Sequence, residues 1–354
     1  MLVYLAVIVG ILLLVFLLKL TFPYRNTDHL FIYGSFIILI LISCLRQNTV
    51  GGDLFNYLPL FEEASTTSFY EYLNMPKYGF IFLFYNKLLS WIGNKEIIYM
   101  VGTSVFNLLS VAIFIKRYSK IPWISVLLYI TLGFYTNTFN SIRSSMALAI
   151  ILYSVPYILN RQFVKFLFIY ICAFIMHKSV FPFILLYFIA QKEISLKKLF
   201  LISIVIFFLV SKVSDIMNLI LILYNPLYEA EELSGGGYFY FLFLLIMLMF
   251  CRYFTSSKDF QERFFFNFVA LGLCIQPAAS CISYINRITI FFSIALIIAV
   301  PNAFSCIRNS KLKMIAGLSL IIFCLLYFIK ITMRIDPELD NNSQGTLFYM
   351  FNWE

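Results

Sequence analysis

The sequence is short of charge, of histidine and of the motifs that hold metal ions. Asp, Glu, Lys and Arg make up 12% of the 354 residues, about half of the ~25% that is usual in soluble domains. There are two histidines, and the patterns D-x-D, H-E-x-x-H and C-x-x-C do not occur. The shortage of charge excludes an ordinary soluble domain, and the missing patterns lead us to expect neither a metal ion nor another cofactor.

The basic residues are scattered, although the net charge is +9. They stand in small groups between apolar runs, and no basic tract has the form expected of a protein that follows a phosphate backbone. We therefore expect no nucleic-acid partner. The seven cysteines lie mostly inside apolar runs, where we interpret them as small buried hydrophobic residues.

Long apolar runs dominate what the sequence does contain. Hydrophobic residues account for 62% of the chain, and many runs approach the ~17–25 residues with which a helix crosses ~30 Å of hydrocarbon. The runs are continuous and do not alternate with period two, which argues against a transmembrane barrel. We predict an all-α polytopic integral membrane helical bundle with about twelve transmembrane helices. The expected spans are 2–20, 30–45, 97–115, 121–137, 143–159, 163–176, 179–190, 199–217, 238–254, 264–281, 288–305 and 312–330.

No internal repeat and no low-complexity linker interrupts the chain, so residues 1–354 are expected to form a single membrane domain. Residues 1–20 lack a basic n-region and a small-residue cleavage site, which indicates a retained first span. The runs 163–176 and 179–190 are short; they fit full crossings, one long broken helix or a re-entrant pair. Segment 78–92 is amphipathic and is expected to lie on the membrane surface or to dip into it.

The distribution of charge predicts how the spans are oriented. With the N-terminus outside, the inward loops and helix ends carry 16 of the 26 basic residues and 4 of the 17 acidic ones. This excess of Lys and Arg follows the positive-inside rule, and it would reverse if segment 78–92 crossed the membrane. Residues 46–96 then form a large extracytoplasmic loop.

Five ionisable side chains are closely tied to apolar spans on the expected outward side: Arg46, Asp53, Arg143, His177 and Arg287. Each has an ordinary alternative. An arginine can anchor a span at the interface, Asp53 can serve as a turn residue after two glycines, and His177 can be a hydrogen-bonded structural group. Anchors are expected mainly on the inward side, however, so three arginines on the outward side favour a functional role.

Three further polar residues accompany these side chains. Tyr57 follows Asp53 by four residues, whereas Asn140 and Tyr284 precede an arginine by three. A spacing of three or four places two residues on one face of a helix. This favours a shared polar cavity in which Asn140, Tyr57 and Tyr284 orient a substrate. Outward-loop tyrosines at positions 57, 70, 72 and 78 are candidates for stacking on sugar rings.

Three arginines around one cavity suit a diphosphate, because the guanidinium is permanently charged and donates hydrogen bonds to phosphate oxygens as a planar fork. Arg143 and Arg287 are the expected ligands, with Arg46 in support, and they would neutralise a leaving group without a metal. His177 is the first candidate for acid–base catalysis, because an imidazole pKa lies near ambient pH. Asp53 is the second.

At these residues the sequence resembles the Wzy-type O-antigen and capsular polysaccharide polymerases, in particular their EpsG-like branch. The matching pieces stand in the family's order. They are Arg46 with Gly52-Asp53 and Tyr57, Asn140-x-x-Arg143, His177-x-Ser179, and Arg287 before an aromatic-rich span. The resemblance covers about residues 40–295.

The resemblance implies a bacterial inner-membrane glycosyltransferase, similar in architecture to the GT-C type, whose active site faces the periplasm or the exterior. Such enzymes transfer a growing glycan from undecaprenyl diphosphate onto a lipid-linked acceptor repeat unit. The implied partners are the undecaprenyl-diphosphate-linked oligosaccharide, membrane lipid, a chain-length regulator and a flippase.

Two other functions remain open. An O-antigen ligase would use the same donor with a lipid A–core acceptor. A lipid-linked oligosaccharide flippase would move the substrate without breaking a bond, but the outward clustering of charge and the lack of a repeat count against transport.

Overall fold

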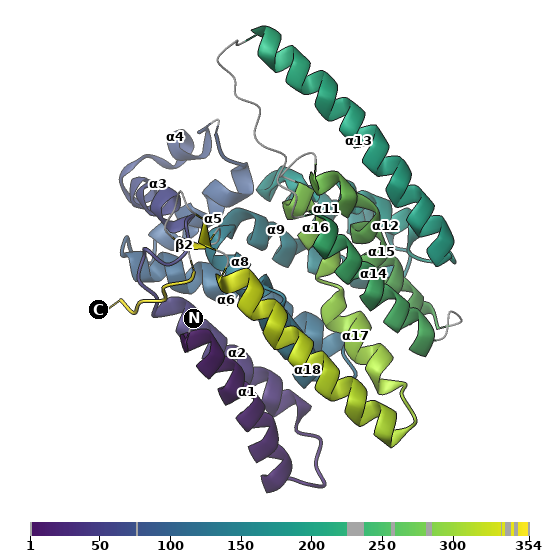
Figure 1. Cartoon of the computed structure of the whole chain (residues 1–354). Helices are drawn as coiled ribbons and strands as arrows, with labels where there is room; N and C mark the ends of the chain where they lie inside the picture. Colours follow the sequence, from purple (N-terminus) through teal and green to yellow (C-terminus); the bar gives the residue numbers. More distant parts are fainter. Residues whose placement is uncertain are drawn as a thin grey trace. The chain divides into compact units, whose positions relative to one another are not determined.

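The structure, a computed structural model, describes residues 2–75, 77–224, 237–255, 259–280, 285–333, 335–336, 341–342 and 346–352. Its regular structure is almost entirely helical, which confirms the prediction of an all-α membrane bundle (Figure 1). The contacts between residues divide the chain into two compact units, residues 1–180 with 307–354 and residues 181–306. The single domain expected over the whole chain stays a prediction.

The first unit is built around a buried helix, α9. Its helices are α1 (Leu2–Thr21), α2 (Asp28–Cys44), α3 (Leu54–Thr66), α4 (Phe69–Leu73), α5 (Phe80–Ser90), α6 (Glu96–Tyr118), α7 (Pro122–Thr131), α8 (Phe134–Asn140), α9 (Ile142–Leu152), α10 (Val155–Leu159), α11 (Phe163–Met176) and α18 (Ser310–Met333). Two short antiparallel strands follow, β1 (Ile335–Asp336) and β2 (Asn341–Asn342). Most residues of α9 are buried, because the helix packs against both α6 and α11.

The second unit is a smaller group of helices. They are α12 (Ile184–Ile189), α13 (Leu196–Tyr224), α14 (Gly237–Phe254), α15 (Phe260–Ile275), α16 (Ile285–Ser293) and α17 (Leu296–Ser305), with the 3₁₀ helix η2 (Gln276–Ser280). A second 3₁₀ helix, η1 (Lys178–Phe183), joins α11 to α12. Helix α17 is buried over nearly its whole length and packs against α14 and α15, so it forms the centre of this unit.

Every predicted span coincides with a helix or with two consecutive helices. Among the described residues, five segments are long and apolar enough to cross a membrane: Leu2–Thr21, Glu96–Tyr118, Ile142–Leu159, Ile285–Ser305 and Ser310–Met333. Several shorter apolar helices accompany them. These segments indicate an integral membrane protein, while the total of twelve spans stays a prediction.

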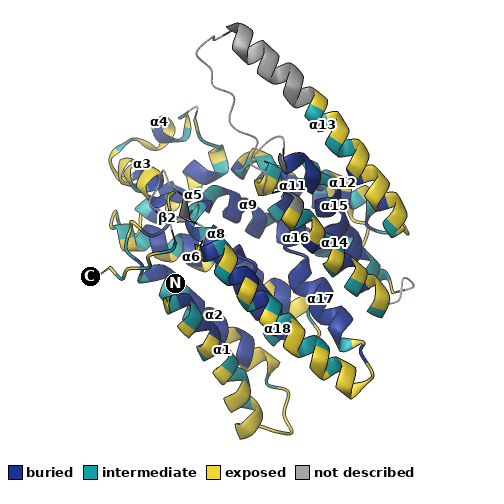
Figure 2. Ribbon diagram, viewed as in Figure 1, coloured by how far each residue is buried: buried dark blue, intermediate teal, exposed yellow. Residues whose placement is uncertain are grey.

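The outer helices of the first unit expose large apolar side chains (Figure 2). On α1, Leu13 is 53% and Phe16 is 62% exposed, and on α18 Leu318 is 56% and Leu326 is 62% exposed. Soluble proteins rarely expose contiguous apolar patches of this kind. These surfaces are therefore suited to contact with lipid.

Some predicted spans are divided into two helices. The span expected over 143–159 consists of α9 and α10, and the spans over 121–137 and 288–305 are divided in the same way. At the break between α9 and α10, Pro156 lies in the first turn of α10. Proline lacks an amide hydrogen and is tolerated in that turn, where no intrahelical partner is needed, whereas it would interrupt a continuous helix.

Helix α5 forms the centre of the amphipathic segment expected at 78–92. Its 11 residues extend over about 16 Å, which is less than the ~30 Å of a hydrocarbon core. Phe80 and Trp91 at its two ends are 54% and 67% exposed, whereas Phe82 and Leu83 are buried. The helix thus covers the first unit with one face and presents apolar side chains outward with the other.

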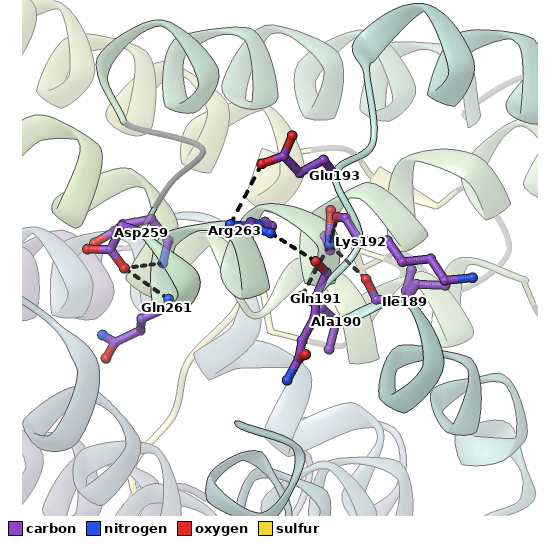
Figure 3. A network of polar contacts seen from close by, with 10 residues as sticks. Ile189, Ala190, Gln191, Lys192, Glu193, Asp259, Gln261 and Arg263 are labelled. Atoms are coloured by element: carbon purple, nitrogen blue, oxygen red, sulfur yellow. Dashed lines mark hydrogen bonds and ion pairs between the residues drawn. The ribbon is translucent and has the colours of Figure 1, made fainter. Parts of the chain in front are cut away.

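A polar network in the second unit fixes the turn after α12 to the start of α15 (Figure 3). The Asp259 carboxylate accepts hydrogen bonds from the amides of Gln261 and Glu262 at 2.9 and 3.3 Å, as a helix N-cap. Arg263 donates to the Gln191 carbonyl at 3.1 Å. One turn further along, Asn267 donates to the carbonyls of Ile189 and Lys192, each at 2.8 Å. The last carbonyl of α12 and two carbonyls of the turn after it are satisfied in this way.

Candidate functional site

Asp53 lies against the start of α9, although 88 residues separate it from that helix in the sequence. Its Oδ2 accepts a hydrogen bond of 2.9 Å from the amide of Ile142, the first residue of α9. The first amides of a helix lack intrahelical partners and carry partial positive charge, so a carboxylate is favourable there. Asp53 thus contacts the residue that directly precedes Arg143 in the sequence.

The two glycines before Asp53 make this approach possible. Gly51 has φ +95°, and a Cβ atom there would lie 2.5 Å from the carbonyl oxygen of Phe139. At Gly52 a Cβ atom would lie 3.0 Å from Oδ1 of Asn140. The loop therefore rests directly on the junction between α8 and α9, and the structure brings Asp53, Asn140 and Arg143 to one place.

Arg143 is held in a cage of three aromatic rings. Its Nε donates a hydrogen bond of 2.7 Å to the hydroxyl of Tyr57. Its Cζ lies 5.4, 5.1 and 5.8 Å from the ring centroids of Tyr57, Tyr78 and Phe82. Cation–π contacts of this kind fix the orientation of a guanidinium. Within the described part of the chain its hydrogen bond is made through Nε, which leaves both terminal amino groups of this half-buried side chain for a ligand.

The hydroxyl of Tyr57 stays protonated beside Arg143. Burial raises the pKa of Tyr57, the negative charge of Asp53 raises it further, and Arg143 acts in the opposite direction. The neutral phenol accepts the hydrogen bond from Arg143 with an oxygen lone pair. Tyr57 thus links the arginine electrostatically to Asp53.

The segment that carries the cage is fixed by a buried lysine. Lys87 of α5 is 6% exposed, and its ammonium group donates to the carbonyls of Ala64 and Thr67 at the end of α3, at 2.5 and 2.7 Å. A cation is favourable at this end of a helix.

Tyr72 is fully buried, and its hydroxyl donates to the Leu60 carbonyl at 2.9 Å. Burial raises the pKa of Tyr72 to about 12. Tyr72 therefore has no face exposed for a sugar ring.

His177 directly follows α11, at the point where that helix meets the start of α5. A Cβ atom at Gly79 would lie 1.9 Å from the carbonyl oxygen of Ile175 and 3.6 Å from that of Met176. Only a glycine permits this approach. Because Tyr78 precedes Gly79 and forms one wall of the cage, the same short segment contacts Arg143 and the residues before His177.

One ring nitrogen of His177 is occupied. Its Nδ1 accepts a hydrogen bond of 3.2 Å from the amide of Ser179. In a neutral imidazole one nitrogen accepts and the other carries the hydrogen. The tautomer assigned from this contact therefore has its hydrogen on Nε2, which acts as a donor.

Arg46 has a different environment. It is 2% exposed, donates to the carbonyl and, at 2.9 Å, to the hydroxyl of Ser43, and lies 4.4 Å from the Phe139 ring centroid. The C-terminal segment covers it: Gln47 N donates to the Met350 carbonyl and Asn352 N to the Leu45 carbonyl, at 2.9 and 3.0 Å. Burial lowers the pKa of Arg46, but from a reference value so high that the group stays charged. Its contact with a diphosphate stays a prediction.

The remaining predicted residues belong to the second unit or lie outside the described residues. Arg287 is exposed on α16, and the neighbouring Asn286 accepts a hydrogen bond of 3.1 Å from buried Gln276. Tyr284 lies outside the described residues. The meeting of Arg287 with the other arginines in one cavity therefore stays a prediction.

A polar pocket of about 390 Å³ lies in the first unit, beside the loop between α2 and Asp53. Its polar lining is Gln47, Asn48, Lys95, Glu96 and Asn352. The pocket was not predictable from the sequence, because its walls come from the loop after α2, the start of α6 and the C-terminal segment. Phe82 and Gly79 are two further residues of the site that were not predicted, and the only signal for them was the Tyr78-Gly79 pair at the start of an amphipathic helix. Among the described residues no group of three His, Cys, Asp or Glu side chains is placed to hold a metal ion.

A family model with the description EpsG family matches residues 29–349, which is most of the chain. The match extends over parts of both units and includes all of the site residues predicted from the sequence. No curated protein matches the chain, and no solved structure does. The GT-C-like architecture therefore stays a prediction.

Proposed function

Because the chain belongs to the EpsG family, whose members are polysaccharide polymerase-like membrane proteins, we propose that it is a repeat-unit polymerase. It transfers a glycan from undecaprenyl diphosphate onto a lipid-linked acceptor repeat unit at the outer face of the bacterial inner membrane. The observation that carries this proposal is the aromatic cage of Arg143. Tyr57 of the cage lies in the same segment as Asp53, and Tyr78 lies beside Gly79, which contacts the residues before His177.

Arg143 binds the donor diphosphate in this proposal. Its Nε is bonded to Tyr57, so the two terminal amino groups contact phosphate oxygens. In the transfer step, the oxygen of an acceptor hydroxyl forms a bond to the anomeric carbon, and the bond from that carbon to the diphosphate oxygen breaks. The departing lipid diphosphate gains negative charge, which a fixed guanidinium stabilises without reorganisation. The proton of the hydroxyl passes to a base.

Asp53 is the base that the geometry favours. The sequence favours His177, but its Nδ1 accepts a hydrogen bond from the Ser179 amide, and in a neutral ring the hydrogen is then assigned to Nε2, which donates. We assign to His177 a hydrogen bond to the leaving diphosphate and to Asp53 the uptake of the proton. Arg46 packs on Phe139, whose backbone lies against Gly51 in the loop before Asp53, so it supports that loop. Arg287 is proposed as the second diphosphate ligand.

The acceptor sugar occupies the polar pocket beside the loop in this proposal. Two amide side chains, Gln47 and Asn48, and the carboxylate of Glu96 line it. Such groups donate and accept hydrogen bonds, which suits the hydroxyl groups of a carbohydrate. Gln47 and Asn48 belong to the same loop as Asp53. An acceptor bound in the pocket therefore lies beside the loop that carries the proposed base.

Deletion of the gene tests the function. Loss of a polymerase leaves the lipid A–core capped by a single repeat unit, and the native chain supplied in trans restores long polymer. Polymer stranded on undecaprenyl diphosphate would instead indicate a ligase. Single units trapped on the cytoplasmic side would indicate a flippase, and either result would overturn the proposal.

The two roles of His177 are separated by a pair of substitutions. In His177→Gln the amide nitrogen stands near the position of Nε2 and still donates, so a donor role predicts partial chain extension. His177→Ala removes the donor and should lose most activity. If His177→Gln is as inactive as His177→Ala at equal abundance, a base role is favoured and the assignment to Asp53 is wrong.

A further inference from the structure

A second pocket of the first unit lies where α2 begins and α6 ends. It measures about 390 Å³, and its polar lining is His29, Tyr33, Lys116 and Arg117. The loop of Asp53 follows the other end of α2, whose 17 residues extend over about 26 Å. The pocket thus lies at the opposite end of α2 from the loop of Asp53.

The two cations of this pocket are held in place by aromatic rings. The Lys116 ammonium donates a hydrogen bond of 2.6 Å to the Tyr33 hydroxyl and lies 5.0 Å from the centroid of that ring. The Arg117 Cζ lies 5.6 Å from the centroid of Tyr118. None of the described residues that line the pocket carries a carboxylate. The arrangement therefore offers two oriented positive charges to an anion.

An exposed apolar stripe leads along α6 to these cations. Val101, Val105, Leu109 and Ile113 recur every four residues and are 40%, 36%, 45% and 40% exposed. Leu109 and Ile113 also form the apolar wall of the pocket. Helix α6 is one of the segments long and apolar enough to cross a membrane, so the stripe faces the region of the acyl chains and the cations lie at its end.

We propose that this pocket binds an anionic glycerophospholipid. Lys116 and Arg117 contact the phosphate of the head group, Tyr33 lies at the level of the glycerol backbone, and one acyl chain follows the stripe. A phosphate ion alone would use the cations and leave the stripe without a role, so the lipid is the occupant that explains both features. Basic pockets between membrane helices on the cytoplasmic side recognise such head groups, and the charge distribution predicts that side for Lys116 and Arg117.

Native mass spectrometry of the full chain released from nanodiscs tests the proposal. The probes are phosphatidylglycerol and phosphatidylethanolamine of the same acyl composition. We expect the native chain to retain phosphatidylglycerol preferentially. The double substitution K116Q/R117Q should weaken its binding by about thirtyfold, because the affinity factors contributed by two cations near an anionic head group multiply.

Two further variants serve as controls. K311Q/K313Q removes two cations at the start of α18, which are expected on the same side of the membrane, and should leave the retention unchanged. Tyr33→Phe keeps the ring and removes the hydroxyl that orients Lys116, and should weaken binding by a few fold at unchanged abundance.

Three results would overturn the proposal. They are equal retention of both lipids by the native chain, equal loss in K116Q/R117Q and K311Q/K313Q, and displacement of phosphatidylglycerol by inorganic phosphate at millimolar concentration. The last result would identify a site for free anions. None of these measurements depends on polymerase activity, so the proposed function is tested separately.

Discussion

Arg46 and Arg143 have the same chemical group and the same expected role, but their surroundings differ. Arg143 is half-buried between aromatic rings, with its terminal amino groups left for a ligand. Arg46 is 2% exposed, and its guanidinium is bonded to Ser43 and packed on Phe139. The comparison shows that the neighbours of an arginine near a span end decide whether its guanidinium is enclosed by packing or has terminal amino groups left for a ligand.

The largest expected effect comes from removal of the caged guanidinium. Arg143→Ala should lower chain extension by about 100- to 1000-fold, because a fixed donor to the developing charge is lost. Arg143→Lys should recover part of the activity, since the charge remains without the planar fork. The measurement is polymer length on gels at matched protein abundance. Normal chain length in Arg143→Ala would contradict the diphosphate assignment.

Gly79→Ala should lower the activity by about tenfold. The added methyl group meets the Ile175 carbonyl and displaces Tyr78 relative to His177, and small displacements of a site are costly. Gly10→Ala is the matched control, because a Cβ atom there has no neighbour within 4 Å. Polymerisation rates in proteoliposomes measure both variants. Equal activity of the two would show that the α5–α11 contact does not position the site.

Tyr57→Phe should have a smaller effect, a loss of about threefold to tenfold. The ring and its cation–π contact remain, whereas the hydrogen bond to Nε of Arg143 is lost. The reduction should appear in the apparent affinity for the donor, measured from the dependence of rate on donor concentration. A loss as large as that of Arg143→Ala would assign the Tyr57 hydroxyl a direct role in the chemistry.

The smallest expected effect on activity comes from Arg46→Met. Methionine keeps much of the buried volume and removes a buried charge, which is often tolerated. The activity per folded molecule should stay within about twofold, although the melting temperature is expected to fall because the Ser43 carbonyl loses its donor. If the variant is folded and inactive, Arg46 contacts substrate and the contrast with Arg143 does not hold.

The positions of the apolar helices were predictable, whereas helices α3 and α4 and parts of the candidate site were not. Each apolar run forms one helix or two consecutive helices. The breaks between paired helices follow from local chemistry, as at Pro156. The proximity of Asp53 to Arg143 followed in outline from their common side of the membrane. The aromatic cage was not predictable, because Phe82 is one of many aromatic residues in an apolar helix. The hydrogen bond to Nδ1 of His177 was not predictable either, and it changes the proposed role of His177 from base to donor.

By itself the sequence determined that this chain is a helical membrane protein and in what order its polar residues occur. Those properties follow from free energies of transfer into lipid, which sum over neighbouring residues. Only the tertiary structure decided which of those residues meet. The contact between Asp53 and Ile142, and the difference between Arg46 and Arg143, depend on how helices distant in the sequence pack together, and local composition carries no record of that packing.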